Sequence, residues 1–462
     1  MSGIISLIDT HAHIYSREYL PDFDEMLERA TTAGVCHIIA VGTDLESSRA
    51  ACELAARYAH ISCTVGIHPH DADRVSEQCY DVILRMAKEQ PKVVAIGEIG
   101  LDFYRDRSLR QSQEEVMRRF IRLARELALP VVIHDRDAHD RVMKILREER
   151  ADQAGGVLHC FSGDLEMARE CVDMGFYISI PGTVTFPGNM ALHDVVRGIK
   201  IEHLLLETDS PYLAPVPFRG KHNEPAHIRF TAAKVAELKG LSLEDVGRIT
   251  SLNARRLFGL GATDQKARIA YRIRNSLYLN ITNRCSNRCS FCAKFDDFTV
   301  KGHLLRLDNE PSFNEVMAAV GDPSGYDEVV FCGYGEPMLR LDLIKEVAAA
   351  LKKSGVRIRI NTDGQANLVY GRNVLPELAG LVDSLSVSLN APDAATYTRL
   401  CNTPFGEKGF AGICEFLREA PRHIPLVTAT AVTVERVEIE AVRRLAASLG
   451  VEFREREYAE VG

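Results

Sequence analysis

The sequence predicts an α/β protein in which a (β/α)8 TIM-type barrel is followed by a partial (β/α)6 barrel. Short apolar runs rich in β-forming residues alternate with amphipathic stretches of helical period, which is typical of βα units on a parallel sheet. The alternation occurs eight times up to about residue 260 and six times after residue 276. Since 462 residues suffice for two or three domains, we expect a barrel domain at 1–260, a linker at 261–275 and a second domain at 276–462.

The first domain is expected to be a closed barrel because it has eight apolar runs separated by helical stretches. The expected strands lie at 4–8, 37–41, 61–65, 93–96, 130–133, 156–158, 177–180 and 203–206. A helix at 242–258 should end the domain, since Ser242 is a good N-terminal cap and Glu244 and Asp245 suit the first turn.

The second domain is expected after a segment that loses periodicity and gathers basic residues, including Lys266, Arg268, Arg272 and Arg274. We interpret this segment as a linker rather than an irregular helix. Its expected strands lie at 277–281, 328–331, 357–360, 384–389, 426–432 and 451–454, with helices such as 342–353 and 435–449 between them. Six βα units predict a partial barrel.

Composition narrows the class of protein. A net charge of −8 and a pI near 6.0 argue against a long electropositive groove, so any nucleic acid must be held locally, through metal and a few arginines. The twelve cysteines are scattered rather than arranged as a disulfide framework, as in a reducing cytosol. No leader is recognised and no apolar run reaches about 18 residues. We expect a cytoplasmic protein without a membrane partner.

Polar residues after the apolar runs are informative because barrel enzymes carry their chemistry at the C-terminal ends of the strands. Five of the eight runs end in potential metal ligands, and alternation in an extended chain directs His11 and His13 to the same side. The candidate ligands are His11, His13, Glu98, His134, His159 and Asp209. A lone histidine here is usually structural, but six ligands at one mouth predict two divalent ions of Zn, Mn, Fe, Ni or Mg, and hydrolytic chemistry.

Three cysteines, Cys285, Cys289 and Cys292, have three and then two residues between them. This spacing can direct the three sulfurs to a common point, and thiolates suit iron. A [4Fe–4S] cluster held by three cysteines leaves one iron open to a reacting molecule. The alternatives are a structural zinc site and three free core thiols. Zinc usually has a fourth Cys or His close by, and none lies at 294–302.

The first domain resembles the TatD family of metal-dependent deoxyribonucleases. The resemblance covers about residues 7–260 and rests on DTHAH at 9–13, GIHPH at 66–70, GEIGLDFYR at 97–105, LHCFSG at 158–163, ETDSPYL at 207–213 and RGKHNEP at 219–225. It implies that His11, His13, Glu98 and Asp209 hold one ion and Glu98, His134 and His159 the other. Glu98 would bridge, and Asp209 would take the proton of the attacking water.

The same resemblance implies an exonuclease-like DNase whose substrate is DNA or another phosphoester. His68, Tyr104, Arg105 and Asn223 would face the phosphate or the leaving group. Tyr104 could instead pack at the barrel rim, and Arg105 could form a surface ion pair. Two other functions are kept open: hydrolysis of a small ester or amide, and a barrel that only binds the substrate of the second domain.

The second domain resembles the radical S-adenosylmethionine (radical SAM) enzymes. The cysteine run, with Phe291 before its last cysteine, carries this resemblance, together with the loop CGYGEP at 332–337. It implies a [4Fe–4S] cluster and reductive cleavage of SAM, with an electron donor such as flavodoxin or ferredoxin. The implied SAM contacts are Gly333, Gly335, Glu336, Asn361, Ser388 and Asn390. For the last three, the alternative is an ordinary turn.

Overall fold

The protein, described here from a computed structural model, divides into two compact units, Met1–Thr263 and Asp264–Gly462. The structure describes residues 5–16, 19, 21–261, 267–295, 298–434 and 437–457. Three predicted features fall partly outside these residues: the start of the first strand at residue 4, Lys266 of the linker, and the first two residues of the helix at 435–449.

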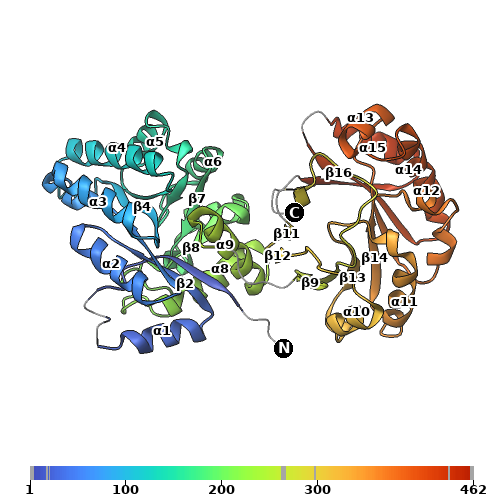
Figure 1. Ribbon diagram of the computed structural model, residues 1–462, viewed down its shortest axis with the longest axis horizontal. Coiled ribbons are helices and arrows are strands. Elements are labelled where there is room, and N and C mark those ends of the chain that lie inside the picture. The colour runs from blue at the N-terminus through green and yellow to red at the C-terminus, as the bar shows by residue number, and fades with distance from the viewer. Residues whose placement is uncertain are drawn as a thin grey trace. The chain divides into compact units, whose positions relative to one another are not determined.

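The first unit is a nearly closed barrel of eight parallel strands in sequence order, surrounded by helices (Figure 1). The strands are β1 Leu7–Ala12, β2 Val35–Val41, β3 Ile61–Val65, β4 Val93–Asp102, β5 Val131–Arg136, β6 Gly156–Leu158, β7 Phe176–Ile180 and β8 Leu204–Leu206. The seam between β1 and β8 is joined just beyond β8, where Asp209 N donates to His11 O at 2.9 Å and His13 N donates to Ser210 O at 2.7 Å. The predicted (β/α)8 barrel is confirmed.

Nine α-helices of the first unit are described. They are α1 Phe23–Thr32, α2 Leu45–Arg57, α3 Glu77–Glu89, α4 Arg110–Leu127, α5 His139–Glu148, α6 Leu165–Asp173, α7 Met190–Gly198, α8 Ile228–Lys239 and α9 Leu243–Phe258. Their apolar faces pack against the strands in one large core, and Ala254 and Phe258 of α9 belong to a second, smaller core. The predicted helix α9 begins as expected, because the Ser242 side chain accepts from Asp245 N at 3.0 Å.

Several strands run further than the apolar runs predicted. The runs at 61–65 and 156–158 match β3 and β6, but β1, β4 and β5 continue through the predicted ligands His11, Glu98 and His134. Pairing with the neighbouring strand continues past the apolar residues, for example between Asp102 and Arg136. His11, Glu98 and His134 therefore lie within strands and share the rigidity of the sheet.

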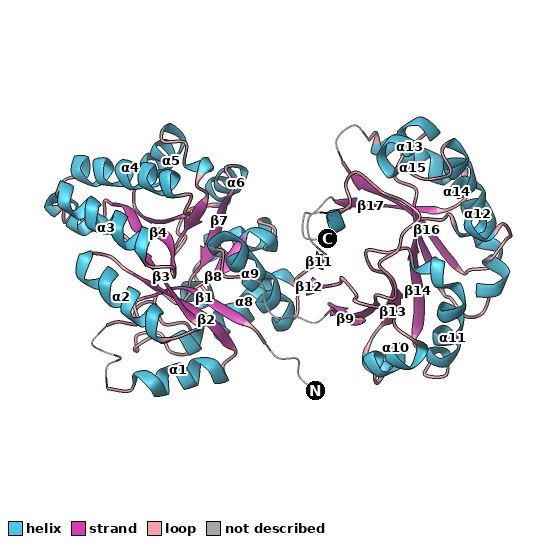
Figure 2. Ribbon diagram, in the orientation of Figure 1, coloured by secondary structure: helices cyan, strands magenta, loops and turns pink. Residues whose placement is uncertain are grey.

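The second unit is built on one seven-stranded sheet in the order β17-β16-β15-β14-β13-β10-β9 (Figure 2). The six predicted strands are present and parallel: β10 Ser276–Leu279, β13 Glu328–Phe331, β14 Arg357–Thr362, β15 Ser384–Ser388, β16 Leu426–Thr433 and β17 Glu452–Glu457. The helices are α10 Phe313–Val320, α11 Leu341–Lys352, α12 Ala366–Tyr370, α13 Ala394–Cys401, α14 Glu407–Glu419 and α15 Ile439–Ser448. Among the described helices of the whole chain, none has the length and apolarity needed to span a membrane.

Part of the predicted linker is structured, which corrects the prediction for 261–275. Strand β9, Ala270–Ile273, lies inside this segment and pairs antiparallel with β10. Tyr271 is buried and its ring stacks on that of Tyr278, 5.4 Å between centroids. A second small hairpin, β11 Thr299–Val300 with β12 His303–Leu304, follows the cysteine run. Strand β9 could not be predicted, because a four-residue edge strand among basic residues shows too little alternation of polar and apolar side chains.

Candidate metal centre and cluster site

The six predicted metal ligands converge at the C-terminal mouth of the barrel, around Glu98. Glu98 Oε2 lies 3.3 Å from His11 Nε2, and Asp209 Oδ1 lies 3.3 Å from His13 Nε2. Glu98 Oε1 lies 2.8 Å from His134 Nδ1 and 2.8 Å from His159 Nε2. The other five ligand side chains thus gather their donor atoms around the Glu98 carboxylate.

The donor atoms form overlapping sets of the size that holds a metal ion. Within each set the ligand atoms lie within 4.8 Å of one another; the sets are His11, Glu98 and His159; His11, His13 and Asp209; and His68, Glu98 and His134. The structure therefore also places His68 among the donors, where the sequence predicted a contact to substrate. Its Nε2 is 3.5 Å from Glu98 Oε1.

Burial and electrostatics fit a cation at this site. Among the described residues, both ring nitrogens of His11 and Nδ1 of His159 are buried without a hydrogen-bond partner, which is costly unless something else binds them. Burial acts to lower the pKa of His159, but the carboxylates of Glu98 and Glu207 outweigh burial and raise this pKa well above its usual value. The pKa of Glu98 is lowered well below its usual value because His159 and His68 outweigh burial. The site thus favours positive charge, which divalent ions would supply in place of protons.

Two buried carboxylates that the sequence did not single out lie behind the histidines. Asp102 Oδ2 is 3.4 Å from His134 Nε2 and 2.8 Å from His70 Nε2. Glu207 Oε1 is 3.7 Å from His159 Nδ1 and accepts from Cys160 N at 2.6 Å. A carboxylate behind a ligand imidazole fixes its orientation and raises its basicity. The only sequence signal was that both are acids in the motifs that contain Glu98 and Asp209.

The predicted substrate contacts divide into two kinds. Tyr104 is 57% exposed and carries the Arg105 guanidinium 5.5 Å from its ring centroid, so both can meet a ligand at the rim. Asn223 is fully buried, and its amide donates to Thr208 O at 2.9 Å and Tyr212 O at 2.6 Å. Its Oδ1 also accepts a hydrogen bond, from Glu224 N. In the structure the Asn223 side chain therefore holds the loop after β8 in place.

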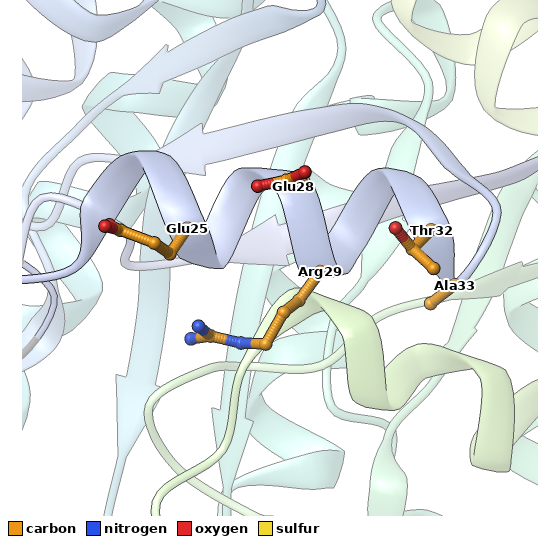
Figure 3. A pocket seen from close by; sticks show the side chains of 5 residues that line it. All are labelled: Glu25, Glu28, Arg29, Thr32 and Ala33. Carbon is orange, nitrogen blue, oxygen red and sulfur yellow. The ribbon is translucent and has the colours of Figure 1, made fainter.

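A hollow beside α1 is separate from this chemistry. It is lined by Glu25, Glu28, Arg29, Thr32 and Ala33 (Figure 3). Arg29 is already held there by Asp22 and Glu224. None of the predicted ligands lines the hollow, so the metal centre remains the candidate site of this unit.

The cysteine run of the second unit forms a half-buried loop after β10. Cys285, Cys289 and Cys292 are each partly accessible. The loop is anchored on the end of α13, where Arg288 N donates to Cys401 O at 3.0 Å. No described set of three donors within 4.8 Å contains these cysteines, whereas a cluster binds each cysteine to a different iron and needs wider spacing. The three thiols on one anchored loop suit such a cluster.

A fourth cysteine, Cys401, lies beside this loop. A hydrogen bond with the Cys401 thiol, together with burial, raises the pKa of Cys289. Cys401 is fully buried. This contact depends on the tertiary fold, which brings α13 against the loop, and could not be predicted from the sequence.

The predicted glycine-rich loop packs directly against the cysteine loop. Glu336 N donates to Arg284 O at 2.7 Å, and a Cβ on Gly335 would lie 2.1 Å from Thr282 O. A Cβ on Gly333 would lie 2.4 Å from Asn280 Oδ1. Gly335 is therefore required for close backbone approach, and Gly333 leaves room for the Asn280 side chain.

Glu336 is buried and accepts from Thr362 Oγ1 at 2.8 Å and Asp363 N at 2.6 Å. Burial and the nearby charge of Asp363 raise its pKa well above the usual value. A cationic partner would relieve this strain between two carboxylates. An ammonium group fits that requirement.

The weaker predicted SAM contacts differ in their surroundings. Asn361 Oδ1 accepts from Arg359 Nη1 at 3.0 Å, and Ser388 is half-buried at the end of β15. Asn390 is buried, and its Oδ1 has no hydrogen-bond partner among the described residues. A ligand hydroxyl could satisfy this oxygen. All three side chains stand at the ends of adjacent strands, as predicted.

The barrel and its ligand-bearing strand ends define the first unit as a metal-dependent hydrolase. Residues 8–259, more than half of the chain, match the family model of TatD related DNase. The chain belongs to this family. The fold class and the resemblance predicted for this part of the sequence are both confirmed.

Three relatives illustrate the match. The "Uncharacterized metal-dependent hydrolase YabD" of Bacillus subtilis is 44% identical over 252 residues, 54% of this chain and 98% of the relative. The "3'-5' ssDNA/RNA exonuclease TatD" of Citrobacter koseri is 39% identical over 259 residues, 55% of this chain and 99% of the relative. The solved structure of YJJV, a TatD homologue from Escherichia coli K12, has a TM-score of 0.53 at 31% identity and covers 56% of this chain and 99% of that one.

The second unit also has a family match. Residues 279–449 match the model of the radical SAM superfamily. The predicted radical SAM domain is confirmed. The chain thus joins a hydrolase barrel of the TatD family to a radical SAM domain.

Proposed function

We propose that the first unit hydrolyses phosphodiesters with two divalent ions of Zn, Mn, Fe, Ni or Mg. One observation carries the proposal: the two oxygens of Glu98 face different sets of donors. Oε2 lies toward His11 and His13, at 3.3 and 3.9 Å, while Oε1 lies 2.8 Å from His134 and from His159. A carboxylate placed in this way can bridge two ions.

The proposed roles follow from position. His11, His13 and Asp209 would hold one ion with Glu98, and His134 and His159 would hold the second. When bound, the ions would polarise a phosphoryl oxygen and acidify water. Asp209, which lies beside His13, would accept the proton of the attacking water. Tyr104 and Arg105 would contact the phosphate at the rim.

The proposed substrate is single-stranded DNA attacked from an end. Support comes from relatives that carry the name "3'-5' ssDNA/RNA exonuclease TatD". The protein has a net charge of −8 and so offers little positive charge for a long contact with a nucleic acid. The end of a single strand, held by the metal ions and by Arg105 at the rim, therefore suits the site better than a duplex. A phosphate contact should weaken as salt rises.

The experiment compares Asp209→Asn with Asp194→Asn, an exposed aspartate whose described ion pair is with Arg197 on α7. Activity is measured on end-labelled single-stranded DNA, a generic phosphodiester and a lactone. We expect Asp209→Asn to lose about 100-fold or more in rate on DNA, and Asp194→Asn to keep it. Equal DNA activity of the two variants, or faster lactone hydrolysis, would refute the proposal.

For the second unit we propose reductive cleavage of SAM. Cys285, Cys289 and Cys292 would hold a [4Fe–4S] cluster, which supplies one electron from a donor such as flavodoxin or ferredoxin. Glu336 would accept hydrogen bonds from the SAM ammonium, and Asn390 would bind a polar group of the cofactor.

This proposal is tested on anaerobically reconstituted protein. We expect [4Fe–4S] absorbance and 5′-deoxyadenosine from SAM plus reductant, both lost in Cys289→Ser. Cys414→Ser, on α14, serves as the control. Wild-type protein that yields no 5′-deoxyadenosine would refute the assignment.

A further inference from the structure

One face of the sheet in the second unit is mostly polar and rich in arginine, and of the SAM contacts predicted from the sequence only Asn361 and Ser388 belong to it. Along each strand alternate residues point to opposite faces. The apolar set, which includes Ile358, Val387 and Ala429, packs in the core. The other set forms what we call the inner face: Arg357, Arg359 and Asn361 on β14, Ser384, Ser386 and Ser388 on β15, Leu426, Thr428, Thr430 and Val432 on β16, and Glu452, Arg454 and Arg456 on β17.

Strand register and side-chain contacts place the arginines on one surface. Thr430 pairs with Arg454 across β16 and β17. The Arg454 guanidinium then reaches over β16, because its Nη2 donates to Ser386 Oγ on β15 at 3.2 Å. Further along, Arg359 Nη1 donates to Asn361 Oδ1 at 3.0 Å. The arginines therefore lie over the sheet and not around its edge.

The positive charge of the inner face is only partly balanced. Arg359 forms an ion pair with Glu328 on β13 and donates two hydrogen bonds to its carboxylate, of 3.1 and 2.8 Å. Among the described residues, neither Arg454 nor Arg456 has a carboxylate partner within 4.0 Å. Burial and the nearby cations Arg359 and Arg456 lower the pKa of Arg454. Two cations remain available to a ligand.

The unbalanced charge adjoins the proposed SAM site. Asn361 and Ser388, two of the SAM contacts predicted from the sequence, belong to the same face as Arg454 and Arg456. Glu336 follows β13 in the same sheet, and its loop touches the cysteine loop. A molecule held by the β17 arginines would therefore lie on the surface where the cofactor is proposed to bind.

We infer that the inner face binds the substrate of the radical reaction and that this substrate is a small molecule with a phosphate or carboxylate group. Arg454 and Arg456 would hold the anionic group, since guanidinium groups donate paired hydrogen bonds to carboxylates and phosphates. The hydroxyls of Ser386 and Thr430 would complete the site. The inference rests on the proposed radical SAM function and adds the chemical class of the substrate.

The test measures binding of inorganic pyrophosphate and of citrate by calorimetry at constant ionic strength. Full-length reconstituted protein carries His11→Ala and His159→Ala, so that the first unit does not contribute a metal-bound anion. We expect saturable binding that weakens about tenfold or more in Arg454→Gln and in Arg456→Gln. Arg443→Gln is the matched control, because Arg443 on α15 pairs with Glu440 and Glu455. Preference between the two probes distinguishes a phosphate from a carboxylate.

Two results would overturn the inference: no saturable binding of either probe, or equal affinities in the parent and both β17 variants. Cluster absorbance and circular dichroism verify that each variant is folded. Formation of 5′-deoxyadenosine by the parent, measured without added anion, reports on the proposed function separately. Intact SAM cleavage with no anion binding refutes only the inference. Anion binding without SAM cleavage refutes the proposed radical function, and with it the assignment of the bound anion as the radical substrate.

Discussion

Asp102 offers a direct test of how the barrel holds its metals. This carboxylate lies behind His134, 3.4 Å from its Nε2, while Nδ1 of the same ring faces Glu98 at 2.8 Å. Burial acts to raise the pKa of Asp102, but hydrogen bonds from His134, the Arg105 N–H and His70 lower this pKa below its usual value. Asp102→Asn keeps the shape of the side chain and removes its charge.

The expected effect is on metal affinity more than on folding. Tyr104 N and Arg105 N donate to Asp102 Oδ1 at 3.1 and 2.6 Å, and an amide oxygen can accept both bonds. What is lost is the negative charge that orients His134 and increases its basicity. Loss of such a partner typically costs 10–100-fold in metal affinity, which corresponds to about 1.4–2.7 kcal/mol. The free energy of unfolding of the metal-free protein should fall by less than about 1 kcal/mol.

The assay is competition for Zn²⁺ or Mn²⁺ against a chromogenic chelator. Asp135→Asn is the matched control, since Asp135 is also buried and adjoins His134, but its oxygens bind Ala138 N and His139 at the start of α5. The reasoning is refuted if Asp102→Asn binds both ions as tightly as wild type. It is equally refuted if the control loses as much affinity.

Three shorter predictions concern stability and the cluster. Burial and neighbouring basic residues lower the pKa of His37 to about 4. As the pH drops from about 6.5 to 4, the unfolded chain protonates His37 before the folded chain does, so the free energy of unfolding falls by at most about 1.4 kcal/mol per pH unit. His37→Gln should flatten this part of the plot of Tm against pH, and parallel plots for the variant and the wild type would contradict the prediction. Chelation of divalent ions should lower the Tm of the first unit, because ions at 100 times Kd add about 2.7 kcal/mol; an unchanged Tm would contradict bound metal. Gly335→Ala should reduce the iron content, since its Cβ would lie 2.1 Å from Thr282 O, whereas Gly325→Ala, with no atom within 4 Å, should not; equal iron contents would disprove the packing argument.

The metal ligands could be predicted because their signal is local. His11 and His13 are two residues apart in an extended strand, and each remaining ligand follows its own apolar run. Asp102 and Glu207 could not be assigned in this way. Their roles depend on which imidazole lies in front of them, and that is set by packing between strands distant in sequence. A motif likewise could not show that the Asn223 side chain is saturated by its own loop.

Element boundaries were less predictable than element types. The apolar runs predicted all fourteen parallel strands, but the ends of β1, β4 and β5 lie in polar sequence. A strand ends where its pairing ends, and pairing is a property of two strands. Strand β9 was missed for the same reason: its partner β10 stabilises a segment whose own sequence is typical of a linker.

The placement of the metal ligands ties coordination to closure of the barrel. Backbone atoms of His11, His13 and Asp209 make the hydrogen bonds that join the strand β1 to the segment after β8, while their side chains form one of the donor sets. An ion held by these side chains would therefore stabilise the seam, and a break in the seam would separate the donors. The same residues that would position the reaction thus complete the fold, so loss of metal should loosen the β1–β8 seam before the rest of the barrel.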